Sequence, residues 1–123
     1  MSRARIALGK IGEDLACREL ERRGYAIVAR RYRRRSGELD IIARDGPTLV
    51  FVEVKARDGR AFGDAVEAVT VFKRRRIAQV AQDYVVQHRL SNCSCRFDVV
   101  SIHFEAERPP VIEVYQNAFD MSF

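Results

Sequence analysis

Apolar residues near the start of the chain recur with the spacing of one helix face. The predicted helix runs from about Ala4 to Arg23, and its apolar stripe consists of Ile6, Ala16, Cys17 and Leu20. Gly24 is expected to end this helix, because glycine readily adopts the positive φ found at helix C-termini. A second helix is predicted to follow Thr70, a good N-cap, and to continue to about Arg89. Its apolar stripe consists of Ile77, Val80, Ala81, Tyr84 and Val85.

Outside these helices, the apolar residues are rich in β-branched types and form short runs that are typical of strands. The runs cover residues 25–30, 39–43, 48–52, 96–104 and 111–117. The turn-forming sequence Asp45-Gly46-Pro47 separates the second run from the third, which predicts a hairpin. The order of elements indicates an α/β protein, and its 123 residues are expected to form one domain.

The predicted hairpin brings two acidic side chains together. A register symmetric about its turn pairs Asp40 with Glu53 and Ile41 with Val52, and directly opposed residues point to the same face. Lys55 lies two positions beyond Glu53, so it faces the same way. Two opposed carboxylates need a neutralising charge. Either Lys55 supplies it in an ordinary surface ion pair, or a divalent ion such as Mg²⁺ binds between the acids.

Asp40 followed by Glu53-x-Lys55 resembles the signature of PD-(D/E)xK nucleases. Longer motifs occur in order along the chain, at residues 12–16, 37–43, 51–57, 65–69 and 96–100. Together, from about Ile6 to Asn117, they resemble the YraN-type uncharacterised bacterial family. Through that family the chain is similar to the restriction-endonuclease-like superfamily, which includes the archaeal Holliday-junction resolvases. The resemblance implies a central mixed β-sheet of about five strands flanked by helices.

The resemblance also implies a reaction, namely metal-dependent hydrolysis of phosphodiester bonds in DNA, including branched DNA. In that reaction Asp40 and Glu53 would bind Mg²⁺ or Mn²⁺, with the Val54 carbonyl as a further ligand. Lys55 would orient or activate the attacking water. Glu13 lies on the core-facing stripe of the first helix and would bring a third acid to the site. From the residues alone, Glu13 is expected to sit at the edge of the stripe, where it reaches solvent or pairs with an arginine.

Glu38 alternates with Asp40 along the predicted strand, so both side chains can face the site. Glu38 would then support the metal site or meet the substrate. The alternative is an ion pair between Glu38 and Arg35.

Positive charge dominates the composition, with 22 lysines and arginines, 17 acidic residues, a net charge of +5 and a pI of about 9.5. This balance favours a polyanionic partner without identifying it. One basic segment precedes the Asp40 strand and is expected to form a loop, either merely solvated or in contact with phosphates; it contains Arg30, Arg31, Arg33, Arg34 and Arg35. Tyr32 within this segment is expected to pack on the first strand, and the alternative is stacking on an unpaired base.

A second basic segment crowds the first turn of the second helix, and it consists of Lys73, Arg74, Arg75 and Arg76. Because the helix dipole disfavours cations at that end, these residues need an external anion or a nearby acid. We predict that they form a second phosphate-binding patch.

Further features of the sequence bear on the localisation of the protein and on disulfide and zinc sites. No apolar run approaches the length of a membrane span, and the N-terminus does not resemble a signal peptide, so we expect a cytosolic protein. The three cysteines provide no disulfide framework, and the spacing of Cys93 and Cys95 does not favour a zinc site. Asp98 is expected to pair with Arg96.

The resemblance also allows a homodimer. The main alternative is a non-catalytic nucleic-acid-binding protein that retains the fold, and a third interpretation is a nuclease acting on RNA.

Overall fold

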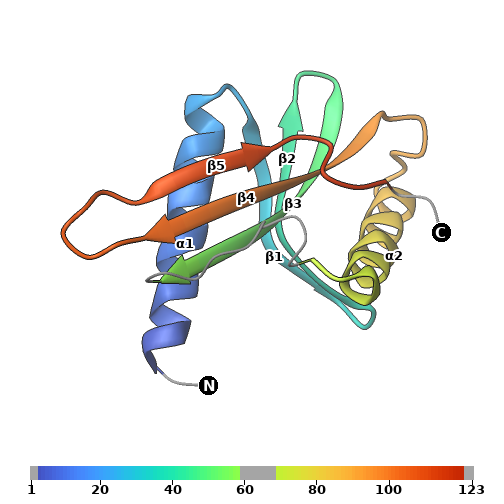
Figure 1. Cartoon of the computed structure of the whole chain (residues 1–123). Helices are drawn as coiled ribbons and strands as arrows, with labels where there is room; N and C mark the ends of the chain where they lie inside the picture. Colours follow the sequence, from blue (N-terminus) through green and yellow to red (C-terminus); the bar gives the residue numbers. More distant parts are fainter. Residues whose placement is uncertain (1–2, 59–68, 121–123) are drawn as a thin grey trace.

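The computed structural model describes residues 3–58 and 69–120. Two helices and five strands occur in the order α1 (Arg3–Arg22), β1 (Ala26–Arg34), β2 (Gly37–Asp45), β3 (Thr48–Asp58), α2 (Val71–Gln87), β4 (Cys95–Phe104) and β5 (Val111–Tyr115). The strands form one sheet in the order β1-β2-β3-β4-β5 (Figure 1).

The sheet is mixed because only one of its strand pairs is parallel. β1, β2 and β3 form an antiparallel meander, and β5 runs antiparallel to β4. β3 and β4 are parallel, and α2 lies in the long connection between them, as a parallel pair requires. The predicted fold class is therefore confirmed, and the arrangement is consistent with a restriction-endonuclease-like fold.

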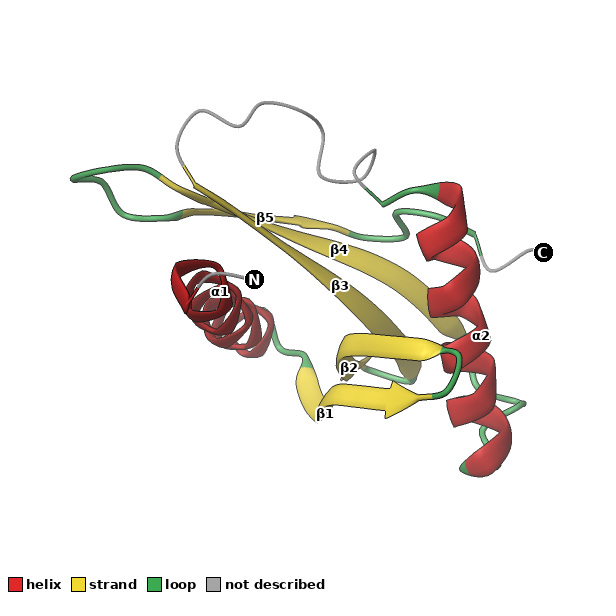
Figure 2. Ribbon diagram, turned by 90° about the horizontal axis from the view of Figure 1, so that it is seen from below, coloured by secondary structure: helices red, strands yellow, loops and turns green. Residues whose placement is uncertain are grey.

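Each face of the sheet carries its own core. In β3, Phe51 packs with the α2 residues Ile77 and Val80, whereas Val50 and Val52 pack with Ala16 and Leu20 of α1 and their neighbours. Strand β3 is thus buried on both faces, which explains its nearly continuous apolar run. Figure 2 shows α1 and α2 on different sides of the twisted sheet.

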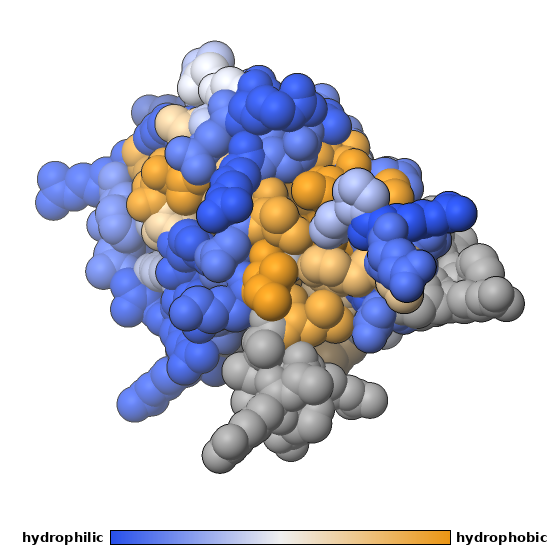
Figure 3. Space-filling view, turned by 90° about the vertical axis from the view of Figure 1, so that its left-hand side faces the viewer, coloured by the Kyte–Doolittle hydropathy of each residue, from blue (hydrophilic) through white to orange (hydrophobic). Residues whose placement is uncertain are grey.

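Partly buried apolar side chains extend the core on the α1 side toward the surface. Figure 3 shows an apolar band between hydrophilic regions on the face seen from the left of Figure 1. The partly buried apolar residues that pack against this core are Leu15, Ile27, Val54, Phe104, Ile112 and Val114.

The C-terminal end of α1 and the N-terminal end of α2 lie at the residues that the sequence indicated. Gly24 has a φ of +95°, and the bonds from Gly24 N to Glu21 O and from Tyr25 N to Leu20 O form a Schellman motif. The Thr70 side chain accepts a hydrogen bond from Lys73 N at 3.2 Å and caps α2. The predicted helix boundaries were correct to within two residues.

Gly12 lets α1 approach the sheet closely. A Cβ atom at this position would lie 2.7 Å from the Cβ of Ala56 on β3. Any larger residue would push α1 away from β3 and from the core that the two elements share.

The first basic segment does not form the expected loop. β1 continues through it to Arg34, with Tyr32 opposite Leu39 and Arg33 opposite Glu38 of β2. The reason is Tyr32, whose ring lies 5.2 Å from that of Tyr84 in α2 and anchors the strand to the core. Tyr32 is therefore part of the first strand and packs against α2, rather than packing on that strand from a loop as predicted, and the arginines around it are exposed.

Asp98 is completely buried on β4 and is paired with Arg96, as expected. The Arg96 guanidinium donates to both Asp98 oxygens at 2.9 and 3.0 Å. The Tyr25 hydroxyl and the Asn117 N–H donate to the same carboxylate, each at 3.0 Å. This network ties the end of α1 to β4 and to the segment after β5, and it satisfies a charge that burial would otherwise penalise.

Within the described residues, no helix is long and apolar enough to cross a membrane. The sequence also predicts a polar loop at residues 57–63 and a short helical turn at residues 64–69, and both segments lie largely outside the described residues. Arg57 and Asp58 belong to the end of β3.

Candidate active site

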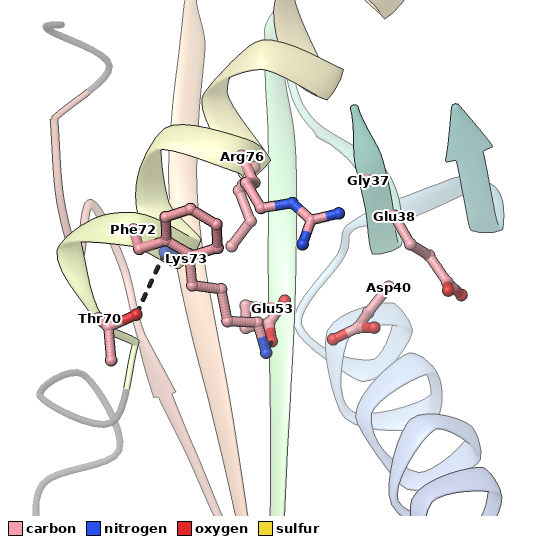
Figure 4. Close-up of a pocket in the computed structure, with 9 residues that line it drawn as sticks. Gly37, Glu38, Asp40, Glu53, Thr70, Phe72, Lys73 and Arg76 are labelled. Carbon is pink, nitrogen blue, oxygen red and sulfur yellow. Dashed lines mark hydrogen bonds and ion pairs between the residues drawn. The ribbon is translucent and has the colours of Figure 1, made fainter. Parts of the chain in front are cut away.

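A cavity of about 480 Å³ lies between the first turn of α2 and strands β2 and β3. Figure 4 shows Phe72 and Lys73 on one side of it, Glu38 and Asp40 on the other, and Glu53 between them. The full lining consists of Gly37, Glu38, Asp40, Glu53, Thr70, Phe72, Lys73, Arg76 and Ile77. The fold thus brings both predicted acids, Asp40 and Glu53, to one cavity.

The hairpin register explains why these acids meet. Ile41 lies opposite Val52, as predicted, and the strand pairing ends there. Asp40 directly precedes Ile41 and contacts β3 through its side chain, because its Oδ2 accepts a hydrogen bond from Val54 N at 2.8 Å. The carboxyl group of Asp40 is therefore held against β3, beside Glu53.

Burial and the charge of Glu53 raise the pKa of Asp40 from its usual value of 3.8 to about 7. The hydrogen bond from Val54 and the charge of Lys73 act in the opposite direction but do not cancel this increase. At neutral pH the site therefore holds a carboxyl group that is close to its titration point. A strongly shifted acid beside a second acid in a cavity is a frequent property of functional sites.

Glu53 is only 5% exposed and contacts two ammonium groups. Lys73 Nζ makes the closer contact with Glu53 Oε1, and Lys55 Nζ lies 3.5 Å from the same oxygen. The sequence predicted Lys55 beside this acid but assigned Lys73 to phosphate. The sequence did contain an indication of this contact, namely the crowding of cations in the first turn of α2. A nearby acid was one of the two explanations for that crowding.

The two lysines have different electrostatic surroundings. Burial and the neighbouring Lys73 lower the pKa of Lys55. For Lys73, burial also opposes the charged form, but the contact with Glu53 outweighs it and raises the pKa. Lys55 is consequently the better candidate for accepting a proton, and Lys73 is the more firmly charged partner of Glu53.

Glu13 is buried on α1 and pairs with two arginines of β1. Its Oε1 accepts from Arg30 Nε at 3.2 Å, and both of its oxygens lie 3.3 Å from Arg31 Nε. It does not line the cavity. In the described part of the chain, no three His, Cys, Asp or Glu side chains are grouped as a metal site. The role of Glu13 as a third metal ligand therefore stays a prediction, and the pairing is the one that the residues alone had suggested.

The basic residues of β1 largely have partners within the protein. Arg33 pairs with Glu38 at 3.2 Å. The partner of Glu38 is therefore Arg33 and not Arg35, which the alternative interpretation of Glu38 had named. Arg34 donates to the Tyr32 hydroxyl at 2.7 Å and to Gln87 of α2. Arg35, in the turn between β1 and β2, is exposed.

Of the basic residues in the first turn of α2, Lys73 and Arg76 line the cavity. Arg74 donates to the Val69 carbonyl at 2.8 Å, and Arg76 donates to the Ser36 carbonyl at 3.2 Å. Arg75 is exposed. Contacts of both basic segments with phosphate stay predictions, and Arg35 and Arg75 are exposed members of these segments.

The chain matches one described family over most of its length. The profile of "Uncharacterised protein family UPF0102" matches residues 12–102. A UPF0102 protein of Geobacter metallireducens is 45% identical over 123 residues, which cover 100% of both chains. A UPF0102 protein of Frankia alni is 48% identical over 121 residues, which cover 95% of this chain and 98% of the relative. These matches confirm the resemblance to the YraN-type family, and the names of these relatives state no activity.

Proposed function

The chain belongs to the uncharacterised protein family UPF0102, and we propose that it is a metal-dependent nuclease that hydrolyses phosphodiester bonds in DNA, including branched DNA. The observation that carries this proposal is the convergence of Asp40, Glu53 and Lys55 at one cavity. These are the residues that resemble the PD-(D/E)xK pattern, and the placement in the restriction-endonuclease-like superfamily is part of the proposal.

The donors at the cavity suit a hard divalent cation. Asp40 and Glu53 offer carboxylate oxygens, which Mg²⁺ and Mn²⁺ prefer, and the Val54 carbonyl is the further ligand that the resemblance implies. The raised pKa of Asp40 supports the same conclusion, because the repulsion from Glu53 that contributes to it is relieved by a bound cation. When bound, the ion would polarise the phosphate and lower the pKa of its water.

The chain's own residues supply the remaining functions. Lys55, whose pKa is lowered, can accept a proton from the attacking water or hold that water in position. Lys73 keeps Glu53 neutralised whenever no divalent ion is present. The exposed Arg35 and Arg75 are placed to attract the DNA backbone.

The test combines metal binding with cleavage. Titration calorimetry with Mn²⁺ and Mg²⁺ is expected to show binding to the wild type and its loss in Glu53→Ala. Single-stranded, duplex, flap and four-way-junction DNA, together with RNA, are then incubated with the wild type, Asp40→Asn and Lys55→Ala. Metal-dependent cleavage that both substitutions abolish supports the proposal. Cleavage that survives both substitutions would place the activity elsewhere, and absence of metal binding to the wild type would refute the metal site.

One observation favours a second candidate, a non-catalytic nucleic-acid-binding protein. Lys73 neutralises Glu53 without any metal, so the site is electrostatically balanced as a purely structural element. That candidate predicts DNA binding that is unchanged by Mn²⁺ and no cleavage of any substrate. Preferential cleavage of RNA in the same panel would instead identify a ribonuclease.

A further inference from the structure

Phe72 is a large apolar side chain that the fold leaves in solvent. It is the second residue of α2 and is 71% exposed, although Ile77 and Val80 of the same helix are buried in the core. Among the large exposed apolar side chains of the described residues, Phe72 is the only aromatic one. The transfer of a phenyl ring out of water is favourable, so a ring held outside the core is suited to pack against a ligand.

The position of the ring connects it to the acidic cavity. Phe72 lines that cavity together with Asp40 and Glu53. Figure 4 shows its ring at the cavity edge, above the side chain of Lys73. A group that lay on the ring would therefore stand next to the two acids.

Positive charge surrounds the same ring. The guanidinium carbon of Arg76 lies 5.7 Å from the ring centroid, and Arg75, in the same turn, is exposed. A ligand with a flat apolar face and an attached negative charge matches this combination of an exposed ring and flanking cations. A nucleotide has both features, since its base stacks on aromatic rings and its phosphate pairs with arginine.

We propose that Phe72 is a stacking platform for an unpaired nucleobase beside the scissile phosphate. This inference rests on the proposed function and specifies its substrate class, namely a nucleic acid with an unpaired nucleotide at the site. Both faces of a base inside a duplex are covered by its neighbours, so only an unstacked base offers a face to the ring. Phe72 is a specificity-determining residue in this arrangement, and Arg76 and Arg75 bind the adjoining phosphates.

The experiment measures binding in the presence of EDTA, so that it is independent of metal and of cleavage. Fluorescence anisotropy gives Kd for a labelled single-stranded oligonucleotide and for a blunt duplex of the same sequence. Phe72→Ala is expected to weaken single-strand binding by about 5- to 100-fold, the usual effect of losing one base–aromatic stack. Duplex binding is expected to change less than about 2-fold, because the duplex does not use the ring.

Matched variants separate stacking from loss of structure. Phe72→Tyr is expected to retain single-strand binding, since it keeps an aromatic face. Val86→Ala removes another exposed apolar side chain of α2, 63% exposed and away from the cavity, and is expected to leave binding unchanged. A 2-aminopurine base in the oligonucleotide should change its fluorescence on binding to the wild type but not on binding to Phe72→Ala.

The outcomes distinguish this inference from the function on which it rests. If the wild type binds the single strand and Phe72→Ala binds it equally well, the stacking platform is refuted and the nuclease proposal stands. Equal weakening of single-strand and duplex binding also refutes it, since the ring would then contact any DNA. If the wild type binds neither DNA form, DNA binding itself fails, and both proposals fail with it.

Discussion

The ammonium group of Lys73, in the first turn of α2, contacts the carboxylate of Glu53 on β3. This contact joins the helix to the sheet at the cavity and neutralises an acid that is almost completely buried. It also means that a divalent ion at Glu53 has to compete with a cation that the protein already provides. Lys73 is therefore expected to increase the stability of the metal-free protein and to lower its affinity for a divalent ion.

Replacing Lys73 by methionine is expected to destabilise the metal-free protein by about 1 to 3 kcal/mol, because Glu53 loses its closer partner and keeps only Lys55. The same variant is expected to bind Mn²⁺ more tightly than the wild type, because the competing ammonium group is gone. Urea denaturation and titration calorimetry measure the two effects. Arg75→Met, an exposed cation of the same turn, is the control, and an equal loss of stability in both variants would contradict the prediction.

Asp40 gives the fold a specific pH dependence. Its pKa in the folded protein is about 7, above its usual 3.8, so between these values the folded state binds more protons than the unfolded state. The contribution of Asp40 to stability therefore falls as pH rises through this window. Asp40→Asn keeps an acceptor for Val54 N and removes the charge. It is expected to exceed the wild type in stability by about 1 to 3 kcal/mol above pH 7, with no gain below about pH 4.

Urea denaturation across this pH range measures the difference between Asp40→Asn and the wild type. Asp58→Asn, which alters an exposed acid at the end of β3, is the matched control and is expected to follow the wild type at every pH. A constant difference between Asp40→Asn and the wild type from pH 4 to 8 would show that Asp40 does not titrate in this window.

Local signals in the sequence explain why so much of the fold could be predicted. The turn at Gly46, where φ is +58°, fixes the hairpin register and thereby places Asp40 near Glu53. Gly24 and Thr70 mark helix ends through short-range hydrogen bonds that their own residue types determine. These features depend on neighbours within a few residues, so the sequence pattern contains them.

The parts that the sequence did not predict depend on contacts between distant elements. The basic segment at residues 30–35 resembles a solvated loop, but its residues up to Arg34 belong to β1, where Tyr32 packs against Tyr84 of α2. The pairing of Lys73 with Glu53 depends on where α2 crosses the sheet, which the spacing of its apolar residues does not determine. The position of Glu13 on the apolar stripe of α1 likewise left solvent exposure or an arginine partner open, and it did not identify Arg30 and Arg31 as the partners.

Two glycines of α1 should respond oppositely to the same substitution. Gly12→Ala places a Cβ 2.7 Å from the Cβ of Ala56, and we expect a net loss of about 1 to 2 kcal/mol as α1 shifts from β3. Gly9→Ala meets no atom within 4 Å and is expected to stabilise the helix by about 0.5 to 1 kcal/mol. Thermal and urea denaturation measure both variants, and a stabilising Gly12→Ala would show that α1 does not approach the sheet this closely.

The exposed arginines should determine how salt affects DNA binding. Each arginine that contacts a phosphate contributes about 0.7 to 0.9 to the slope of log K against log salt concentration. Arg35→Ala and Arg75→Ala are each expected to reduce that slope by about this amount. Arg22→Ala is the control, because Arg22 is also exposed but lies on α1 and pairs with Glu19 at 2.6 Å. Anisotropy titrations in EDTA at several salt concentrations provide the slopes. If Arg35→Ala and Arg75→Ala match Arg22→Ala, neither Arg35 nor Arg75 contacts the DNA backbone.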